Sequence, residues 1–340
     1  MNQPELCERA AKRQRTDEGE TSVIDEVEAS AAAATRHSKH WYRDGSIVLH
    51  VDDVLFRVHQ TTLERLSDFF KDLFGVPQPE GEEQVEGCLV VRLGGDKCVD
   101  WVHLLDAMYD NLYFDSLASQ TLGDSFPSTS SILRLATKYL IIAYRRKCIT
   151  ILSRHFPSRA IFQPKDFNRG ITPNQCGDMI SLGRELNLLA LLPSAYLLLV
   201  TYPAANPTET ADVVYSVVSI SPHDKNDIYH GTLGLITAQA DALFPFAHTF
   251  TPPDDCEQGD CSPCPSFAPL HRQPCVIHFF NKGEFTALKS TICEVCRKKL
   301  KEIYREGRQK TWERLPEIFR LGKDWDELRR IQDNDGTMDL

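Results

Sequence analysis

The stretch "DGSIVLHVDDVLFRVHQTTLERLSDFFKDLF", residues 44–74, decides how the front of the chain is expected to fold. Apolar residues alternate with other residues through "SIVLHV" (46–51) and again through "VLFRVH" (54–59), which is the period of a β-strand. Asp52 and Asp53 lie between the two runs, and aspartate is a common turn residue. The sequence therefore predicts a tight hairpin here.

A helix is predicted directly after the hairpin. Thr61 is followed three residues later by Glu64, the spacing of a capping box at a helix start. Five apolar residues then fall on one helical stripe: Leu63, Leu66, Phe70, Leu73 and Phe74. Gly75 and Pro77 are expected to end this helix.

Farther along, the sequence predicts a third strand and then helices. "CLVVRL" (88–93) has the composition of a strand, and residues 99–112 have helical periodicity. A polar segment with Pro127 follows, after which Ser130 or Ser131 can cap the next helix. Strands followed by helices indicate an α+β fold.

Composition and charge indicate the class of protein and its expected location in the cell. The 340 residues are 42% hydrophobic and 25% charged, which is typical of a globular chain with two or three domains. The formal net charge of −10 argues against nucleic-acid binding by the chain as a whole, because binding to phosphates needs an excess of Lys and Arg. The amino terminus has no apolar signal-like run, and the longest apolar run, "LNLLALLPSAYLLLV" (186–200), is too short for a membrane span. With an odd total of eleven cysteines, these features predict an intracellular protein of the nucleus or cytoplasm, without membrane contact.

Four regions are expected along the chain. Residues 1–39 lack apolar periodicity and are predicted to be a disordered tail, in which "KRQR" (12–15) is either a nuclear-import signal or a chance cluster. Residues 40–156 form the α+β domain, and residues 157–250 form a helical domain. In that domain, residues 167–202 are expected to form a helical pair, and Ser221-Pro222 predicts a further helix start. Residues 251–340 contain a cysteine-rich loop and charged carboxy-terminal helices.

The α+β region resembles the BTB (POZ) domain over about residues 40–156. The residues that carry the resemblance are Asp44, Val48, Phe56, Val58, His59, Leu63, Ser67 and Phe70, followed by Leu135, Ala136, Tyr139, Cys148 and Leu152. The resemblance implies a short mixed sheet flanked by helices, used for self-association and for binding protein partners. A substrate adaptor for a cullin-type ubiquitin ligase is one function in that family. A nuclear transcription- or chromatin-associated regulator that recruits cofactors is the alternative.

Two features depart from the usual family pattern. Gln60 follows His59 where a basic residue is usual, and the insert "GVPQPEGEEQVEG" (75–87) is longer than the link in many relatives. The remainder of the chain is similar to a group of fungal BTB-containing proteins whose helical, cysteine-containing carboxy-terminal half is uncharacterised. That similarity is carried by "VEGCLVV", "YDNLYFDS", "LLALLPSAYLLL" and "CEVCRKKLKEIYREGRQKTWERLPEIFRL".

His59 has two interpretations. It could act as a general base, or it could be a structural histidine that forms hydrogen bonds with buried polar groups at the strand end, because such groups are costly when unpaired. No nucleophile with a supporting residue lies nearby in sequence, which favours the structural role. The chain also lacks a Gly-rich phosphate loop, a Gly-x-Ser-x-Gly turn and a His-Glu-x-x-His helix, so no enzyme activity is predicted.

Six cysteines lie between Cys256 and Cys296 and suggest a metal site. Cys261-x-x-Cys264 and Cys293-x-x-Cys296 could together supply the four ligands of a structural zinc ion. Cys275-x-x-His278 is a third pair, but it lies in a strand-like run where residues three apart face opposite sides. The alternative is that the cysteines are free thiols, which pack like small apolar residues, and that no cofactor is bound.

The carboxy-terminal tail has a basic segment. "RKKLKEIYREGRQKTWERL" (297–315) contains eight basic and three acidic residues, with Tyr304 and Trp312 between them. It could bind nucleic acid, or it could be a solvated helix whose aromatic residues pack inward. The return of acidic residues after Glu317 favours the solvated helix.

Overall fold

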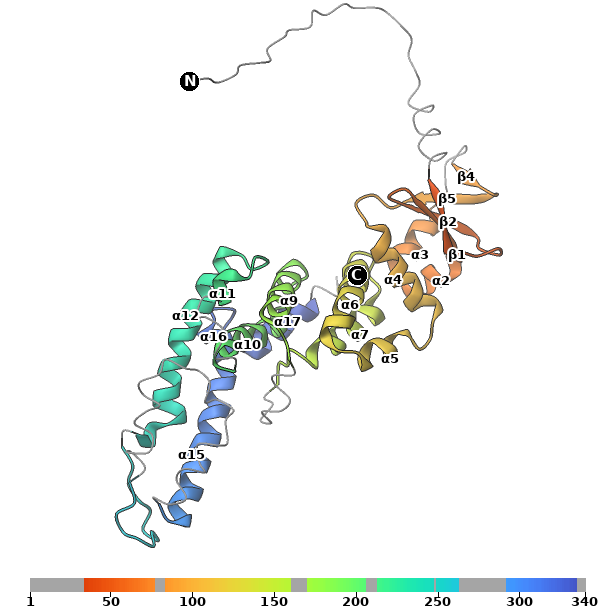
Figure 1. Ribbon diagram of the computed structural model, residues 1–340. Helices are drawn as coiled ribbons and strands as arrows, with labels where there is room; N and C mark the ends of the chain where they lie inside the picture. Colours follow the sequence, from red (N-terminus) through yellow and green to blue (C-terminus); the bar gives the residue numbers. More distant parts are fainter. Residues whose placement is uncertain are drawn as a thin grey trace, which may run out of the picture. The chain divides into compact units, whose positions relative to one another are not determined.

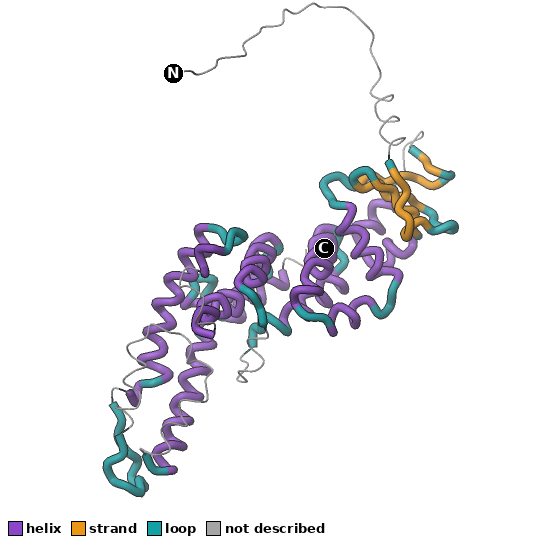
Figure 2. The backbone as a smooth tube through the Cα atoms, in the orientation of Figure 1, coloured by secondary structure: helices purple, strands orange, loops and turns teal. Residues whose placement is uncertain are grey.

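The computed structural model describes residues 34–76, 83–159, 170–205, 213–247, 249–262 and 292–334. The fold class is α+β: within these residues all strands precede residue 93, and the other regular elements are helices, joined by loops (Figures 1 and 2). The described chain divides into two units. The sheet unit comprises residues 34–58 and 83–98, and the helical unit comprises residues 59–76 and those from 99 onward.

The sheet unit is a five-stranded mixed sheet in the order β1-β3-β2-β5-β4. Its strands are β1 (Thr35–Trp41), β2 (Ile47–Val51), β3 (Val54–Val58), β4 (Gln84–Val85) and β5 (Cys88–Arg92). The predicted hairpin is confirmed, because β2 and β3 pair antiparallel from Ile47↔Val58 to Val51↔Val54. β2 also pairs parallel with β5, so β2 lies at the centre of the sheet.

Strand β1 was not predicted from sequence, since the tail was expected to extend to residue 39. β1 runs parallel to β3 at the edge of the sheet. Its sequence, "TRHSKHW", has no apolar alternation because most of its side chains are exposed. Backbone bonds hold it in place, including Thr35 N–H to Asp53 O (2.8 Å) and, just beyond the strand, Tyr42 N–H to Arg57 O (2.9 Å).

The front of the helical unit contains six helices. They are α2 (Gln60–Leu66), α3 (Asp68–Gly75), α4 (Cys98–Tyr109, whose first residue belongs to the sheet unit), α5 (Tyr113–Ser119), α6 (Leu122–Lys138) and α7 (Ile142–Ser153). Phe70 of α3 is fully buried and stacks on Tyr139 at 4.9 Å between ring centroids. Trp101 of α4 meets Phe70 edge-on at 6.1 Å, so an aromatic cluster joins these helices.

The single helix predicted after the hairpin is wrong, because the chain breaks at Ser67. Ser67 is extended (φ −140°, ψ 118°), and its hydroxyl accepts the Phe70 N–H (3.2 Å) while donating to the Tyr139 carbonyl (2.6 Å). The predicted capping box is also wrong. Helix α2 begins at Gln60, one residue before Thr61, and Glu64 instead accepts a bond from the Gln60 side chain (2.8 Å).

The expected helix start at Ser130 or Ser131 is wrong as well. Helix α6 begins after Thr121, whose hydroxyl donates to the Asp124 carboxylate (2.7 Å), and it continues through Pro127. Nine side chains of α6 are buried, and this packing outweighs the loss of one backbone hydrogen bond at the proline.

The remaining elements are helical, as expected. They are α9 (Pro173–Glu185), η1 (Leu189–Leu191), α10 (Leu192–Ala205), α11 (Val213–Ser216), α12 (Pro222–Ala238), the π-turn η2 (Gln239–Leu243), η3 (Pro245–Ala247), α15 (Glu294–Glu313), α16 (Leu315–Ile318) and α17 (Trp325–Asn334). The predicted helix start at Ser221-Pro222 is confirmed, since the Ser221 hydroxyl caps α12. Within the described ranges, every helix is too short or too polar to cross a membrane.

Candidate metal centre

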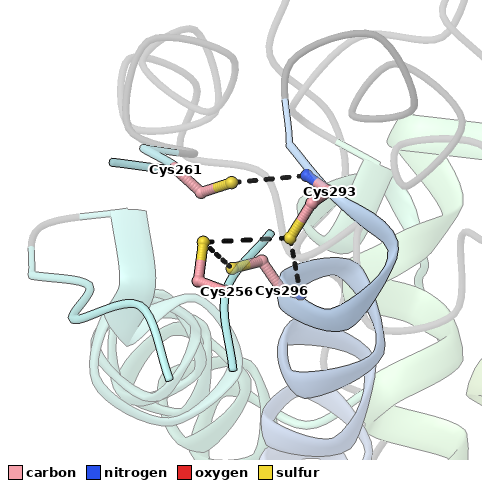
Figure 3. A group of neighbouring side chains, drawn as sticks. All are labelled: Cys256, Cys261, Cys293 and Cys296. Carbon is pink, nitrogen blue, oxygen red and sulfur yellow. Dashed lines mark hydrogen bonds between the residues drawn. The ribbon is translucent and has the colours of Figure 1, made fainter. Parts of the chain in front are cut away.

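Four cysteines from two segments of the helical unit converge on one point (Figure 3). Cys256 and Cys261 lie in the loop 249–262, and a turn closed by Cys256 N–H to Pro253 O (2.9 Å) precedes them. Cys293 and Cys296 lie at the start of α15, where Cys293 is the N-cap. Residues three apart in the first helical turn lie on the same side of the helix, so both sulfurs can face the loop.

The four sulfur atoms all lie within 4.8 Å of one another. The Cys256 sulfur is 3.5 Å from that of Cys296 and 3.9 Å from that of Cys293. A tetrahedral metal site with metal–sulfur bonds of about 2.3 Å places its sulfurs about 3.8 Å apart. The cluster is thus close to the size that a four-thiolate site requires.

Backbone amides point at the sulfurs. The Cys293 amide donates to the Cys261 sulfur (3.3 Å), and the Cys296 amide donates to the Cys293 sulfur (3.5 Å). The N-terminus of α15 adds the positive end of the helix dipole. Amide donors and a helix N-terminus both favour the thiolate, which is the form that binds metals.

The pKa values of the four thiols divide into two pairs. A backbone hydrogen bond from Gln258 lowers the pKa of Cys256 to about 6, and the amide of Cys296 lowers the pKa of Cys293. Burial raises the pKa of Cys261 and of Cys296, and the neighbouring thiols raise that of Cys296 further. Four thiols this close cannot all ionise to thiolates without a cation to offset the repulsion between their negative charges.

Cysteines outside the cluster have a different environment. Burial raises the pKa of Cys148 and of Cys176 to about 12, and both side chains are almost fully buried. These thiols stay neutral and act as small apolar core residues. The cluster at α15 is therefore distinct, and it can hold a metal ion.

Three of the four clustered cysteines were predicted from sequence as ligands. Cys261, Cys293 and Cys296 come together, whereas Cys264 lies outside the described residues, as do Cys275 and His278. Cys256 was missed because four residues separate it from Cys261, so the pair does not have Cys-x-x-Cys spacing. The sequence signal that could have pointed to Cys256 is Gly259, a turn-forming residue between the two cysteines. In the structure Gly259 has a φ of +78°, which glycine adopts readily.

The residues that carry the BTB resemblance differ in hydrogen bonding and burial. His59 Nδ1 lies 2.9 Å from the Tyr109 hydroxyl, which also accepts the His59 amide (3.1 Å). Phe56, Leu63 and Phe70 are buried, whereas Asp44 is exposed. The bonding of His59 supports its interpretation as a structural histidine.

The basic tail is the helix α15, as predicted, and its two aromatic residues point into the core. Tyr304 and Trp312 are 6% and 4% exposed. Trp312 stacks on Trp325 with centroids 5.6 Å apart, and Trp325 Nε1 donates to the Trp312 carbonyl (2.8 Å). Neither aromatic ring is available to stack on a nucleic-acid base, so the solvated-helix interpretation accounts better for the tail.

Comparison with known proteins gives no assignment. The chain matches no family model, and it matches no curated protein.

Proposed function

We propose that the chain is a protein-interaction scaffold whose front part, residues 40–156, is a BTB-type domain. The observation that carries this proposal is the order and pairing of the elements. An antiparallel hairpin (β2, β3) is followed by two short helices (α2, α3), by a strand (β5) that pairs parallel with β2, and then by helices α4–α7. The resemblance to the BTB family implies a short mixed sheet flanked by helices, and this order of elements supports it.

The contacts of the shared residues support a docking role rather than a chemical one. Ser67 ends one helix and caps the next, Phe70 packs in an aromatic cluster, and His59 is bonded to Tyr109. Each of these residues fixes the position of neighbouring elements. A domain of this kind provides a rigid surface on which partners bind.

Affinity capture with quantitative mass spectrometry tests the proposal. The full chain serves as bait in cells of its source organism, and the captured proteins are scored for cullin subunits and for nuclear cofactors. Enrichment of cullin subunits supports a ubiquitin-ligase adaptor, and enrichment of chromatin cofactors supports the alternative nuclear regulator. The scaffold proposal is contradicted if stringent washing leaves no stoichiometric protein partner, a second copy of the chain included.

We also propose that Cys256, Cys261, Cys293 and Cys296 hold one structural zinc ion. Four thiolates in tetrahedral arrangement suit Zn²⁺ and disfavour Mg²⁺ or Ca²⁺, which prefer oxygen ligands. Zinc would tie the loop 249–262 to the first turn of α15. Because such a site exists only in the folded chain, the binding energy of the metal stabilises the fold.

Metal analysis of the purified chain tests the zinc site. We expect about one zinc per chain, lost in Cys296→Ser and retained in Cys98→Ser, whose thiol is half-buried and outside the cluster. A wild-type zinc content near zero after purification in zinc-containing, reducing buffer would leave free thiols as the correct interpretation.

A further inference from the structure

The four clustered cysteines are not equivalent in exposure or in contacts. Cys256 is half-buried, whereas Cys261, Cys293 and Cys296 are 4%, 6% and 0% exposed. Cys256 also has sulfur contacts with both helix cysteines, at 3.5 Å to Cys296 and 3.9 Å to Cys293 (Figure 3). A small oxidant from solvent therefore reaches Cys256 first, and it finds a second sulfur directly behind it.

We propose that this site is a redox-controlled metal site, in which a peroxide oxidant joins Cys256 to Cys296 and releases the metal. The inference rests on the proposed zinc site and adds a regulation to it. Cys256 is the attacking residue because it is the most exposed ligand. Cys296 is its partner because its sulfur is closer to that of Cys256 than the Cys293 sulfur is.

The reaction balances with hydrogen peroxide as the oxidant and two protons taken from solvent. The Cys256 sulfur attacks one peroxide oxygen, so that an S–O bond forms, the O–O bond breaks, and the departing hydroxide takes up a proton to become water. The Cys296 thiolate then attacks the Cys256 sulfur. The S–S bond forms, the S–O bond breaks, and the departing hydroxide takes up a second proton from solvent to become the second water. Two thiolates lose two electrons in total, and the peroxide is reduced to two waters.

Metal release follows from the change in ligands. The disulfide sulfurs no longer carry the negative charge of thiolates, so only Cys261 and Cys293 remain as ligands. Two ligands do not complete the tetrahedral set of a structural zinc site. Zinc departs, and the remaining thiolates take up protons as the cation leaves.

The disulfide between Cys256 and Cys296 can form with only a small movement of the chain. The two sulfurs must approach from 3.5 Å to about 2.05 Å. Cys256 lies in a loop, so its side chain can move while Cys296 stays in the first turn of α15. Both the metal and the disulfide join the same loop to the same helix, so oxidation changes the kind of link without separating the two segments.

The experiment uses the reduced, zinc-loaded full chain. Zinc is quantified first, then hydrogen peroxide is added in steps while a chromogenic chelator reports free zinc. We expect about one zinc to be released per chain, with a Cys256–Cys296 cross-link in tandem mass spectra of the non-reduced protein. Dithiothreitol followed by zinc should restore the starting metal content. Cys98→Ser, which changes a half-buried thiol outside the cluster, should release zinc over the same range of peroxide.

Three outcomes distinguish failure of the redox switch from failure of the proposed zinc site. A chain that holds no zinc at the first step refutes the proposed metal site itself. A chain that holds one zinc and keeps it in excess peroxide refutes only the redox control. Release without a Cys256–Cys296 cross-link, with sulfinic acids in its place, also refutes the switch, because that loss is not reversed by a thiol reductant.

Discussion

Asp224 is a buried carboxylate of the helical unit with three side-chain hydrogen-bond donors. The residue is 4% exposed and receives hydrogen bonds from the Ser221 hydroxyl (2.6 Å), the Arg184 guanidinium (2.8 Å) and the Tyr196 hydroxyl. These partners come from α9, α10 and the cap of α12, so one side chain joins three elements. Burial raises the pKa of Asp224, but the hydrogen bonds outweigh it and hold the pKa below its ordinary value.

Replacing Asp224 by Asn tests this network. The amide keeps the shape of the side chain but removes the negative charge to which Arg184 and Tyr196 donate hydrogen bonds. We therefore expect the unfolding free energy to fall by about 1–3 kcal/mol at pH 7. A lowered pKa stabilises the fold above the unfolded-state pKa, and that contribution is lost as pH falls through the folded-state value. The difference between wild type and Asp224→Asn should therefore be largest at neutral pH and shrink below about pH 4.

Asp326→Asn is the matched control for this prediction. Asp326 also pairs with an arginine, Arg329 (2.7 Å), but its side chain is 84% exposed. An exposed pair contributes little, so we expect a change below about 0.5 kcal/mol. Denaturant unfolding of both variants between pH 3 and pH 7 provides the measurement. Equal stability of wild type and Asp224→Asn at pH 7 would contradict the role of the network.

At the scale of elements, α15 packs against η2 through a glycine. A Cβ atom added at Gly307 would overlap the backbone carbonyl of Ala242 and lie 3.1 Å from Leu243 Cα. Backbone atoms cannot rotate away as a side chain can. The close approach of the two segments therefore requires glycine, and it positions the helix that begins with Cys293 and Cys296.

We expect Gly307→Ala to destabilise the chain by about 1–3 kcal/mol or more, the usual cost of overpacking a core. Gly75→Ala is the control, because Gly75 is also helical, as the last residue of α3, but has no neighbouring atom within 4 Å of the added Cβ. Alanine favours helix over glycine, so Gly75→Ala should be neutral or slightly stabilising. Thermal unfolding followed by circular dichroism compares the two. A Gly307→Ala variant as stable as wild type would show that α15 and η2 separate easily.

The elements that were predicted from sequence depend on local chemistry, whereas those that were missed depend on contacts distant in sequence. The hairpin β2–β3 and the start of α12 follow from local chemistry, namely alternation, a turn and a Ser-Pro cap, and both are confirmed. The break at Ser67 depends on a hydrogen bond to Tyr139, which lies 72 residues away. The passage of α6 through Pro127 depends on burial. Neither the bond nor the burial can be read from a local window.

The cysteine cluster illustrates the same limit at the level of a site. Cys293 and Cys296 were predicted because one helical turn sets their spacing. Cys256 and Cys261 reach them across a sequence separation of more than thirty residues, and spacing alone could not choose between Cys256 and Cys264. Among the described residues, the fold places the Cys256 sulfur within 4 Å of both helix sulfurs.

At the scale of the whole molecule, the surface of the front region bears on how it would bind a partner. Four large apolar side chains between residues 69 and 112 are exposed: Phe69, Val76, Val99 and Leu112. Large exposed apolar side chains mark an interaction surface when they form a contiguous patch. If the chain self-associates through its front domain, as the proposed scaffold would, these residues are candidates for the contact.

Light scattering coupled to size-exclusion chromatography of the full chain tests self-association. We expect a mass above that of one chain at tens of micromolar, decreasing on dilution. Leu112→Glu introduces a charge at a side chain that is 69% exposed, and a charge buried in an interface without a partner is costly, so the variant should shift the equilibrium toward monomer by tenfold or more. Val218→Glu, at a position 94% exposed outside the front domain, should behave as wild type. A wild-type chain that is monomeric throughout this range would contradict self-association. A Leu112→Glu variant that associates like wild type would move the contact away from Leu112.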